Sequence, residues 1–592
     1  MASVSIKEFR TLSKYLHKYR FRYLFGFIFL ILVDAAQILI PQYVRYAIDL
    51  ISSGNYSVKA ILPFCLAIVG TAAVISFGRF FWRYFIHGSS RRIETEIRDG
   101  LFAHLMSLSP SFYQNNKIGD LMARATNDLN AVRMAIGMGL VAFIDGTFMA
   151  AAILTIMFIQ DAKVSAIAII PLPFITALII GFGKAVGHRF KKAQETYASM
   201  SDIVQETFAG IRVVKSFVKE DWFIQKFADA NDDYRNANMS LVRVYGLFFP
   251  LITFLAGLTT LIMLFVGGSR VIEGNMSAGE LVAMLSYLQM LIWPMLGAGF
   301  TINMMQRGAA SLARINEIFA TVPDIRSPAF PKTTHKDYAG ECCALELRNL
   351  SFSYPNGKLA LDSISFSIPQ GATLGIFGRT GSGKSTLLRL LPRLLDPPPS
   401  SIFIDGIDVR DRDLNELRSL FGITPQDTYL FSDSIKNNIA YGATNPTEER
   451  LRSVAELSAI AGDLEDFTNG WDTVVGERGF TLSGGQKQRV AISRAIVRDP
   501  DILILDDALS AVDAETEERI LASLVRDRRD KTTIIVSHRV STLRYADFVA
   551  VLDSGCLKEF GKPEALISSK GYFAETARLQ RLESSHSNKG GN

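Results

Sequence analysis

Long runs of apolar residues crowd the first half of the chain, and only short ones occur in the second half. Each long run holds about 20 residues, enough for an α-helix to cross about 30 Å of hydrocarbon. A helix is the expected form because lipid offers no hydrogen-bond partner to exposed backbone groups. The pattern predicts six membrane-spanning helices, near residues 21–40, 60–82, 136–159, 164–182, 245–267 and 278–296.

Basic residues mark alternate connections between these spans. Lysine and arginine cluster before the first span and after the second and fourth, whereas the connections 160–163 and 269–277 are short and carry few charges. By the positive-inside rule, this asymmetry places both termini in the cytoplasm. The segments 83–135 and 183–244 are too long and too polar to be turns. We interpret them as helical extensions that reach into the cytoplasm.

The pattern changes after about residue 320. Three prolines and little apolar periodicity in 321–341 indicate a linker. Beyond it, alternating segments and the buried runs ATLGIFG and DILILD, with helical stretches between them, predict an α/β domain with parallel strands. We expect a transmembrane domain over 1–320, a linker over 321–343, the α/β domain over 344–580 and a disordered polar tail over 581–592.

Composition supports a membrane protein with a reduced cytoplasmic side. The chain has 592 residues, 48% of them hydrophobic, and a mean hydropathy of +0.20. Its net charge of +5 gives no case for a nucleic-acid partner. The four cysteines lack the spacing of a zinc site or a disulfide scaffold. No cleavable signal peptide is predicted, because the first apolar run is long and lacks a small-residue cleavage site.

The segment GRTGSGKS (378–385) matches the phosphate-binding pattern G-x-x-x-x-G-K-[ST] and lies between a predicted strand and an apolar helix, as the motif requires. Its glycines let backbone N–H groups surround phosphates at a helix start. Lys384 should reach the β- and γ-phosphates, and Ser385 should hold Mg²⁺. The expected nucleotide contacts from this loop are Gly378, Arg379, Thr380, Gly381, Ser382, Gly383, Lys384, Ser385 and Thr386.

A second motif is the apolar strand DILILD, which ends in Asp506. A carboxylate at the end of such a strand is the expected Mg²⁺-side ligand of an ATPase. Many strands end in aspartate, so this signal becomes specific only beside the phosphate-binding loop. Together the two motifs predict a domain that binds ATP and Mg²⁺.

With the segment LSGGQKQR (482–489), the second half resembles the nucleotide-binding domains of ATP-binding-cassette (ABC) transporters. The resemblance implies that two such domains sandwich two ATP molecules, each between the phosphate loop of one chain and the signature of the other. It assigns nucleotide contacts across that interface to the signature residues Ser483, Gly484, Gly485 and Gln486.

Other elements of the family follow in the expected order. Tyr354 matches the aromatic residue that stacks on adenine. Gln426 matches the glutamine that contacts Mg²⁺ and senses the membrane domain, and His538 matches the histidine that contacts the γ-phosphate. The segments GERG (476–479) and SAVD (510–513) resemble the loop before the signature and the loop that links the two ATP sites. Taken alone, each of the three single residues also fits an ordinary structural role: Tyr354 as a strand aromatic, Gln426 as a surface amide and His538 as a strand-end histidine.

The first half also resembles this family. The segments 112–132 and 205–221 are similar to the cytoplasmic loops of six-helix exporter half-transporters, whose short helices dock on the nucleotide-binding domains. The resemblance implies a multi-domain membrane protein, with an all-α six-helix transmembrane domain followed by an α/β P-loop ABC ATPase domain. It also implies a place in the bacterial cytoplasmic membrane, with membrane lipids and a hydrophobic small-molecule substrate as partners.

Asp507 departs from the family pattern, which has a glutamate that orients or deprotonates the attacking water. Aspartate is one methylene shorter, so its carboxylate falls back by about 1.5 Å. A misplacement of about 1 Å can cost on the order of 10²-fold in rate. We expect a site that binds Mg-ATP well and hydrolyses it slowly, with Asp507 and His538 as its catalytic residues.

The family includes bacterial heterodimeric exporters in which one half reads LDD at this position and keeps its own signature. This chain has both features, so it most resembles that half of heterodimeric multidrug exporters. We predict ATP-driven export of hydrophobic or amphipathic molecules, with a second half-transporter that supplies the glutamate. The alternatives are a homodimer in which Asp507 works adequately, a homodimeric translocator of lipid or lipid-linked substrates, and an ATP-gated channel or regulator.

Polar residues interrupt the predicted spans. Asp34 and Gln37 lie in the first, Arg79 in the second and Asp145 in the third. Because buried charges are costly in lipid, they indicate a polar substrate path or an Asp34–Arg79 pair that breaks during switching. A structural ion pair or an interfacial position is the alternative. An adaptable apolar pocket or ordinary helix packing would explain the aromatic and methionine residues Phe248, Phe249, Met290, Trp293, Met295, Phe300 and Met304.

Overall fold

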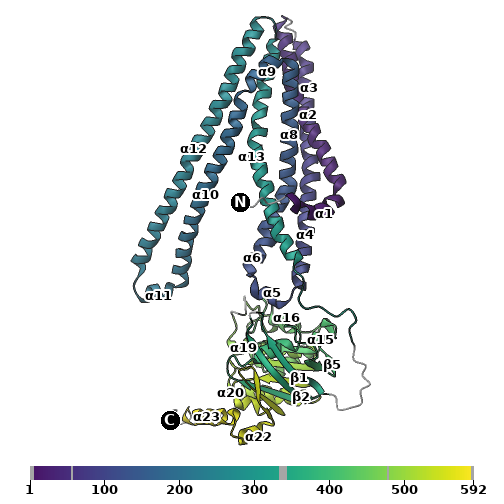
Figure 1. The fold of residues 1–592 in the computed structure, drawn as a ribbon, viewed down its shortest axis with the longest axis vertical. Coiled ribbons are helices and arrows are strands. Elements are labelled where there is room, and N and C mark those ends of the chain that lie inside the picture. Colours follow the sequence, from purple (N-terminus) through teal and green to yellow (C-terminus); the bar gives the residue numbers. More distant parts are fainter. Residues whose placement is uncertain are drawn as a thin grey trace. The chain divides into compact units, whose positions relative to one another are not determined.

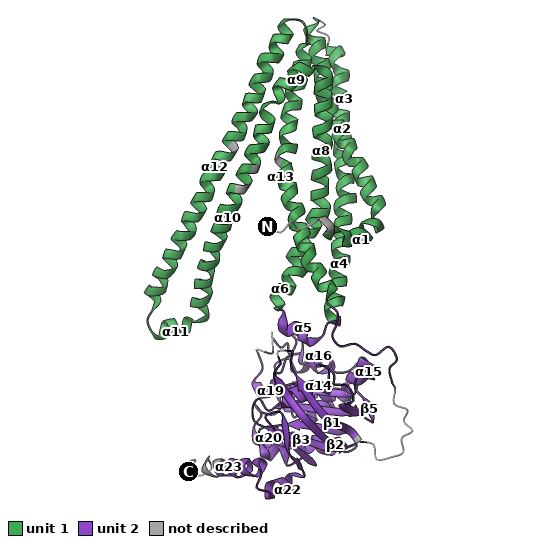
Figure 2. Cartoon of the chain, viewed as in Figure 1, with its two compact units in different colours: residues 1–106, 117–321 green, residues 107–116, 322–592 purple. Residues whose placement is uncertain are grey.

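The computed structural model describes residues 6–54, 58–332, 343–355, 357–476, 479 and 481–587. The side chain of Phe249, and Glu477 and Arg478 of the predicted GERG loop, lie outside this part. The chain forms two compact units (Figure 2), residues 1–106 with 117–321 and residues 107–116 with 322–592.

Unit 1 consists of helices joined by short connections, and its described residues contain no strand (Figure 1). Its helices are η1 (Ile6–Leu12), α1 (Ser13–Lys18), α2 (Arg20–Ser52), α3 (Val58–Trp82), α4 (Gly88–Ser107), α6 (Ile118–Ala123), α7 (Leu129–Met134), α8 (Leu140–Gln160), α9 (Ala162–Ile169), α10 (Pro171–Ala209), α11 (Ile211–Ser216), α12 (Glu220–Ile272) and α13 (Ala278–Ala320). Single π-helical turns join some of them without a break, at η2 (Arg83–His87), η3 (Arg124–Asp128) and η4 (Ala135–Gly139).

Among the described residues, six helical runs are long and apolar enough to cross a membrane. They are Arg20–Ser52, Val58–Ser107, Ile118–Gln160, Ala162–Ala209, Glu220–Ile272 and Ala278–Ala320. Each run contains one predicted span, so the prediction of six spans is confirmed. Most runs are much longer than the about 20 residues that a bilayer needs, because the polar segments that precede or follow the spans continue the same helices.

Unit 1 is held together by contacts among its long helices. The helix α2 packs against α3 and α13, α8 packs against α13, and α10 lies beside α12 (Figure 1). Ile153, Met157 and Tyr287 are fully buried in the apolar core between these helices. The helix α13 starts with a capping box, in which Ser277 and Glu280 satisfy each other's backbone N–H groups.

The predicted pocket residues have different environments. Met290 and Met295 pack against the core of unit 1, and Met304 is buried. The ring of Phe248 stacks on Phe182 at 4.2 Å between ring centroids. The side chains of Trp293 and Phe300 are exposed. Substrate contact by these residues stays a prediction.

The Asp34–Arg79 pair that the sequence suggested is not formed. Arg79 Nη2 donates to Gln37 Oε1 at 3.4 Å, and no ion pair joins Arg79 to Asp34 within the described residues. The reason is geometric: Asp34 and Gln37 lie one turn apart on α2, and the guanidinium reaches the amide. Asp34 is instead enclosed, with no solvent-exposed surface.

Unit 2 contains two sheets (Figure 1). The four-stranded sheet has the order β2-β1-β4-β5 and is antiparallel, with β1 (Cys343–Ser353), β2 (Leu359–Pro369), β4 (Ile402–Ile404) and β5 (Ile407–Asp408). The six-stranded sheet has the order β10-β9-β3-β8-β7-β6, with β3 (Thr373–Gly378), β6 (Phe421–Thr424), β7 (Ile502–Asp506), β8 (Thr532–Val536), β9 (Phe548–Asp553) and β10 (Cys556–Gly561). Only β10 runs antiparallel to its neighbour in this sheet.

Helices complete unit 2. They are α5 (Pro110–Asn115), α14 (Lys384–Leu390), α15 (Leu414–Ser419), α16 (Ile435–Ala440), α17 (Glu448–Leu457), α18 (Ala461–Asp466), η5 (Gly470–Asp472), α19 (Gly484–Ile496), α20 (Ala514–Asp527), α21 (Val540–Leu543), α22 (Pro563–Ser568) and α23 (Tyr572–Ser587). The chain after unit 1 is tied to α5, because Ile325 N donates to Ser109 Oγ at 3.2 Å and Ser111 Oγ donates to Asp324 Oδ2 at 3.0 Å.

Residues 581–587 of the predicted polar tail are helical, because α23 continues to Ser587, and residues 588–592 lie outside the described part of the chain. Good helix formers such as Leu579, Gln580 and Arg581 carry the helix past the predicted boundary.

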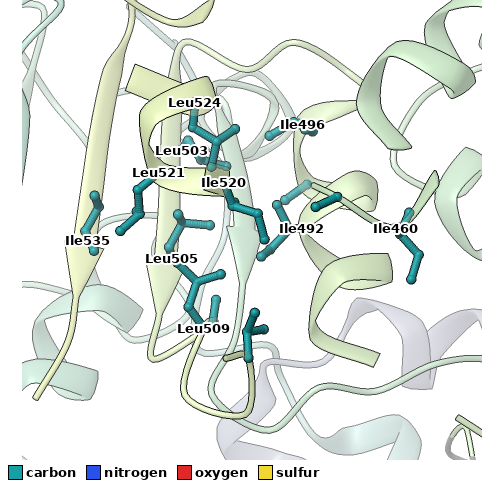
Figure 3. Packing of buried hydrophobic residues seen from close by; sticks show 14 of the residues in the cluster. Ile460, Ile492, Ile496, Leu503, Leu505, Leu509, Ile520, Leu521, Leu524 and Ile535 are labelled. Atoms are coloured by element: carbon teal, nitrogen blue, oxygen red, sulfur yellow. The ribbon is translucent and has the colours of Figure 1, made fainter. Parts of the chain in front are cut away.

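The main core of unit 2 fixes the position of β7. Every residue of β3 and β8 is buried, as expected for central parallel strands. Figure 3 shows side chains of β7 and β8 packing against α19 and α20. The residues labelled there are Ile460, Ile492, Ile496, Leu503, Leu505, Leu509, Ile520, Leu521, Leu524 and Ile535. Because Leu503 and Leu505 anchor the strand, the carboxylates at its end, Asp506 and Asp507, have a defined place.

Candidate functional site

Four neighbouring parallel strands end at one edge of the six-stranded sheet, in the order β3-β8-β7-β6. The phosphate-binding loop follows β3, His538 follows β8, Asp507 follows β7 and Gln426 follows β6. The register pairs Asp506 with Val536, so the segments that follow β7 and β8 leave the sheet at the same level along the strands. Ligands of open α/β sheets bind at this edge. The sheet therefore brings together the residues that four separate sequence motifs predicted.

The phosphate-binding loop requires its glycines. A Cβ atom on Gly378 would lie 2.2 Å from the carbonyl oxygen of Leu552, and one on Gly383 would lie 2.6 Å from a methyl carbon of Leu361. Gly381 and Gly383 have φ angles of +83° and +102°, which favour glycine. The loop can therefore bring backbone N–H groups close to a ligand without intervening side chains.

Two polar side chains of this loop fit an anionic ligand. The Lys384 ammonium is buried and donates to the carbonyl oxygens of Gly378 and Arg379 at 2.7 and 2.9 Å. Burial lowers the pKa of Lys384, and the carboxylates of Asp507 and Asp506 act in the opposite direction. Ser382 Oγ is buried and has no hydrogen-bond partner among the described residues. A phosphate group would neutralise the lysine and satisfy the hydroxyl, so the loop fits the phosphates of ATP.

The remaining predicted contacts of this loop lie at its two ends. The Tyr354 hydroxyl and Thr386 Oγ1 are 3.0 Å apart, which places the tyrosine beside the start of α14. Its stacking on adenine stays a prediction. Arg379 Nε donates to the Tyr572 hydroxyl at 3.2 Å, and its guanidinium lies 5.0 Å from that ring. No sequence motif indicated this contact between the phosphate-binding loop and α23. Thr380 is exposed.

The three residues proposed for Mg²⁺ supply oxygen ligands of the kind that this cation prefers: the Ser385 hydroxyl, the Gln426 amide and the Asp506 carboxylate. Burial, and then the nearby Asp507, raise the pKa of Asp506 to about 6. A desolvated carboxylate beside a second one is the environment that a divalent cation stabilises. The described residues contain no group of three or more His, Cys, Asp or Glu side chains suited to a metal. One carboxylate with one hydroxyl and one amide suits a cation that is also held by nucleotide phosphates.

Acidification should weaken this Mg²⁺ site. Since the pKa of Asp506 is raised to about 6, the carboxylate is ionised at pH 7.5 and is mostly protonated at pH 5. We expect the Mg²⁺ concentration needed for half-maximal binding of a fluorescent ATP analogue to rise about tenfold between these values. Asp506→Asn is the control, and it should need high Mg²⁺ at both pH values. An unchanged Mg²⁺ requirement in the wild type would contradict the assignment.

Asp507 and His538, the two predicted catalytic residues, contact each other. His538 Nε2 lies 3.3 Å from Asp507 Oδ2. Asp507 has a φ angle of +47°, a left-handed conformation that aspartate tolerates better than most residues. A cavity of about 160 Å³ lies beside them and is lined in part by Ser510, Glu517 and Arg539. The short carboxylate is thus directed at the histidine, and open space lies next to it.

A buried carboxylate behind this cavity was not indicated by any motif. Glu517 on α20 is buried and accepts hydrogen bonds from Arg539 Nη1 and Thr542 Oγ1. Arg539 Nη2 also donates to the carbonyl oxygen of Ser510 at 3.3 Å. Glu517 therefore ties the segment that carries His538 to the loop 510–513. The sequence feature that could have identified Glu517 is an acidic residue on the apolar face of an amphipathic helix.

Removing this carboxylate should destabilise the protein. Glu517→Ala leaves the Thr542 hydroxyl and part of the Arg539 guanidinium without their partner, which costs about 1–3 kcal/mol. We expect the midpoint of thermal unfolding of the purified chain to fall by several degrees. The matched control is Glu518→Ala, because Glu518 is adjacent and exposed, and its removal should change stability by less than about 0.5 kcal/mol. Equal midpoints for the two variants would show that Glu517 does not anchor this region.

The signature residues form the start of α19. Ser483 Oγ accepts from Gln486 N at 3.3 Å, and Gln486 Oε1 accepts from Ser483 N at 3.0 Å. Gln486 Nε2 also donates to Asp463 Oδ1 at 2.9 Å. A Cβ atom on Gly485 would lie 2.9 Å from the carbonyl oxygen of Ala511, so this glycine allows the loop 510–513 to pack against the signature.

Gln488 joins the signature helix to the segment that follows β7. Its Nε2 donates to Ser510 Oγ at 2.9 Å and to the carbonyl oxygen of Asp507 at 3.3 Å. The part of the chain that the structure describes shows no hydrogen bond between side chains of 483–486 and the loop 378–386. The chain thus brings the phosphate loop, carboxylates, histidine and glutamine to one edge, whereas the signature contacts the loop after β7.

Comparison with known proteins identifies relatives over nearly the full length. The family model described as ABC transporter transmembrane region matches residues 23–295, and the model described as ABC transporter matches 361–510. The probable multidrug resistance ABC transporter ATP-binding/permease protein YheI of Bacillus subtilis (strain 168) is 36% identical over 97% of both chains. The multidrug resistance-like ATP-binding protein MdlA of Escherichia coli (strain K12) is 34% identical over 98% of this chain and 97% of its own.

Two further similarities extend this result. An ATP-dependent lipid A-core flippase of Syntrophus aciditrophicus (strain SB) is 33% identical over 83% of this chain and 81% of its own. The solved structure of a bacterial Atm1-family ABC exporter with ATP bound superposes with a TM-score of 0.76 at 27% identity, covering 95% of this chain and 98% of that chain.

Proposed function

This chain belongs to the ABC exporter family, as a half-transporter whose ATPase domain couples ATP hydrolysis to transport, and we propose that it exports hydrophobic or amphipathic small molecules as one half of a heterodimer. Its own ATP site, with Asp507, turns over slowly, and the partner chain supplies a glutamate in the other site. The ATPase domain and both termini lie on the cytoplasmic side of the bacterial inner membrane. The multidrug names of two full-length relatives support the substrate class.

The observation that carries this proposal is the geometry of Asp507. Its carboxylate is one methylene shorter than the usual glutamate and is directed at His538 at 3.3 Å. A base must lie within hydrogen-bond reach of the water that it activates, and a shift of about 1 Å can cost on the order of 10²-fold. The signature Ser483–Gln486 is complete, so it can serve the competent site of a partner.

The site residues then have distinct tasks. Lys384 and the loop N–H groups bind the phosphates, and His538 contacts the γ-phosphate. Mg²⁺, held by Ser385, Gln426 and Asp506, would neutralise phosphate charge when bound. Asp507, held against His538, is a weak base, so ATP stays at this site and keeps the two nucleotide-binding domains together. Turnover at the partner's site resets the transmembrane helices.

Assembly in native membranes tests the heterodimer. The tagged chain should co-purify in equal amount with a second half-transporter that carries glutamate after its metal-side aspartate. Recovery of tagged and untagged copies of this chain alone would instead support a homodimer.

The lipid A-core flippase relative makes lipid translocation the second candidate function. Vesicles that contain the assembled transporter can separate the two. We expect ATP-dependent movement of an amphipathic dye across the bilayer, with spin-labelled phospholipid moving no faster than in vesicles that carry the Lys384→Ala variant. The reverse pattern would assign the chain to lipid translocation.

A further inference from the structure

An unpartnered carboxyl group lies inside the transmembrane domain. Asp34 on α2 has no exposed surface, and neither of its carboxyl oxygens has a hydrogen-bond partner among the described residues. Its neighbours along the helix, Val33 and Ala36, belong to an apolar cluster with Ile75 of α3. A carboxylate in such surroundings is costly, so its presence needs a compensating group.

The charged groups that act on Asp34 are Asp145 on α8 and Arg79 on α3. The helix α2 packs against both α3 and α8. Arg79 donates to Gln37 rather than to Asp34, and no ion pair of Asp34 or Asp145 occurs within the described residues. Of these two charged groups, Asp145 acts more strongly on Asp34 than Arg79 does, so the main electrostatic neighbour of the buried carboxyl group is another carboxyl group.

Two ionised carboxylates cannot satisfy each other, because each is only a hydrogen-bond acceptor. Like charges at short range in a medium without water also repel strongly. One proton removes both problems, since it turns one group into a donor and lowers the charge of the pair to −1. A proton also needs no additional space, which matters because Asp34 is wholly enclosed.

We propose that Asp34 and Asp145 form a proton-binding site within the transmembrane domain, which holds one proton while α2 and α8 are packed together and exchanges it with water when they separate. The transport cycle then includes one protonation step at each copy of this pair. The proton comes from water and returns to water, without any change of oxidation state. The site does not depend on the transported substrate or on the identity of the partner chain.

Infrared spectroscopy of the full chain in lipid tests this directly. At pH 7.5, where Asp506 is ionised, the wild type should show the carbonyl band of a protonated carboxyl group in an apolar environment. Asp34→Asn and Asp145→Asn should each lose this band. Both variants should still fold, because the asparagine amide N–H replaces the shared proton as hydrogen-bond donor.

Thr147→Val is the matched control on α8, since Thr147 is exposed, two residues from Asp145, and donates only to its own helix at Phe143 O, 2.7 Å away. It should keep the band. Absence of the band in the wild type, or its persistence in both asparagine variants, would overturn the proposal.

As a second readout, a pH indicator should report about one proton exchanged per chain on ATP-driven closure in the wild type, and none in Asp34→Asn.

Discussion

Replacing Asp507 with glutamate is expected to raise the ATPase rate of the purified chain in lipid by about 10²-fold. The added methylene extends the carboxylate by about 1.5 Å. The cavity of about 160 Å³ beside Asp507 gives it room, although glutamate fits the φ angle of +47° less well. Because the signature Ser483–Gln486 is complete, two copies of the variant can form two complete sites. Phosphate release measures the rate.

Asp507→Asn is the matched control for this gain. It keeps the shape of the side chain and removes the carboxylate charge, so the slow rate should change little. A loss of two orders of magnitude in Asp507→Asn would show that Asp507 already acts as an efficient base. A rate in Asp507→Glu equal to that of the wild type would show that side-chain length does not limit hydrolysis.

Replacing Lys384 with alanine is expected to weaken ATP binding by about 10- to 10²-fold. The ammonium is buried and donates to two carbonyl oxygens of the phosphate loop at 2.7 and 2.9 Å. When ATP binds, the ammonium can donate to phosphate oxygens instead. Hydrogen bonds to charged groups contribute about 1.5–3 kcal/mol each. Titration with a fluorescent ATP analogue measures the affinity.

Lys436→Ala is the control for the lysine change. Lys436 lies in the same unit, but it pairs with Glu448 on the surface at 3.0 Å, and exposed pairs contribute little. Its affinity for ATP should equal that of the wild type. Equal affinities in wild type and Lys384→Ala would contradict the placement of the phosphates on this loop.

The sequence was sufficient for features that depend on local pattern. Six spans follow from the length and apolarity of the runs, and the structure confirms them. The buried strands before the phosphate loop and Asp507 were predicted from continuous apolar residues, which suits strands covered on both faces. Parallel strand order then explains why distant motifs meet at one edge.

Features that depend on which helix faces which could not be predicted. The sequence suggested an Asp34–Arg79 ion pair, but the Arg79 guanidinium donates to Gln37. The helix α2 packs against α8, and Asp145 on α8 is the charged group that acts most strongly on Asp34. Glu517 and Gln488 lie within ordinary helical patterns, and their roles depend on contacts with loops that are distant in the sequence. Even the end of α23 was missed, because polar helix formers look like a tail.

The ATPase rate of this chain, purified alone in lipid, most directly tests the claim that Asp507 makes its site slow. We expect a rate equal to the background set by Lys384→Ala, with ATP still bound by the wild type. That result would mean that the chain needs a partner with a glutamate. A rate well above this background would mean that Asp507 is a competent base in a homodimer, and it would contradict the proposed asymmetry.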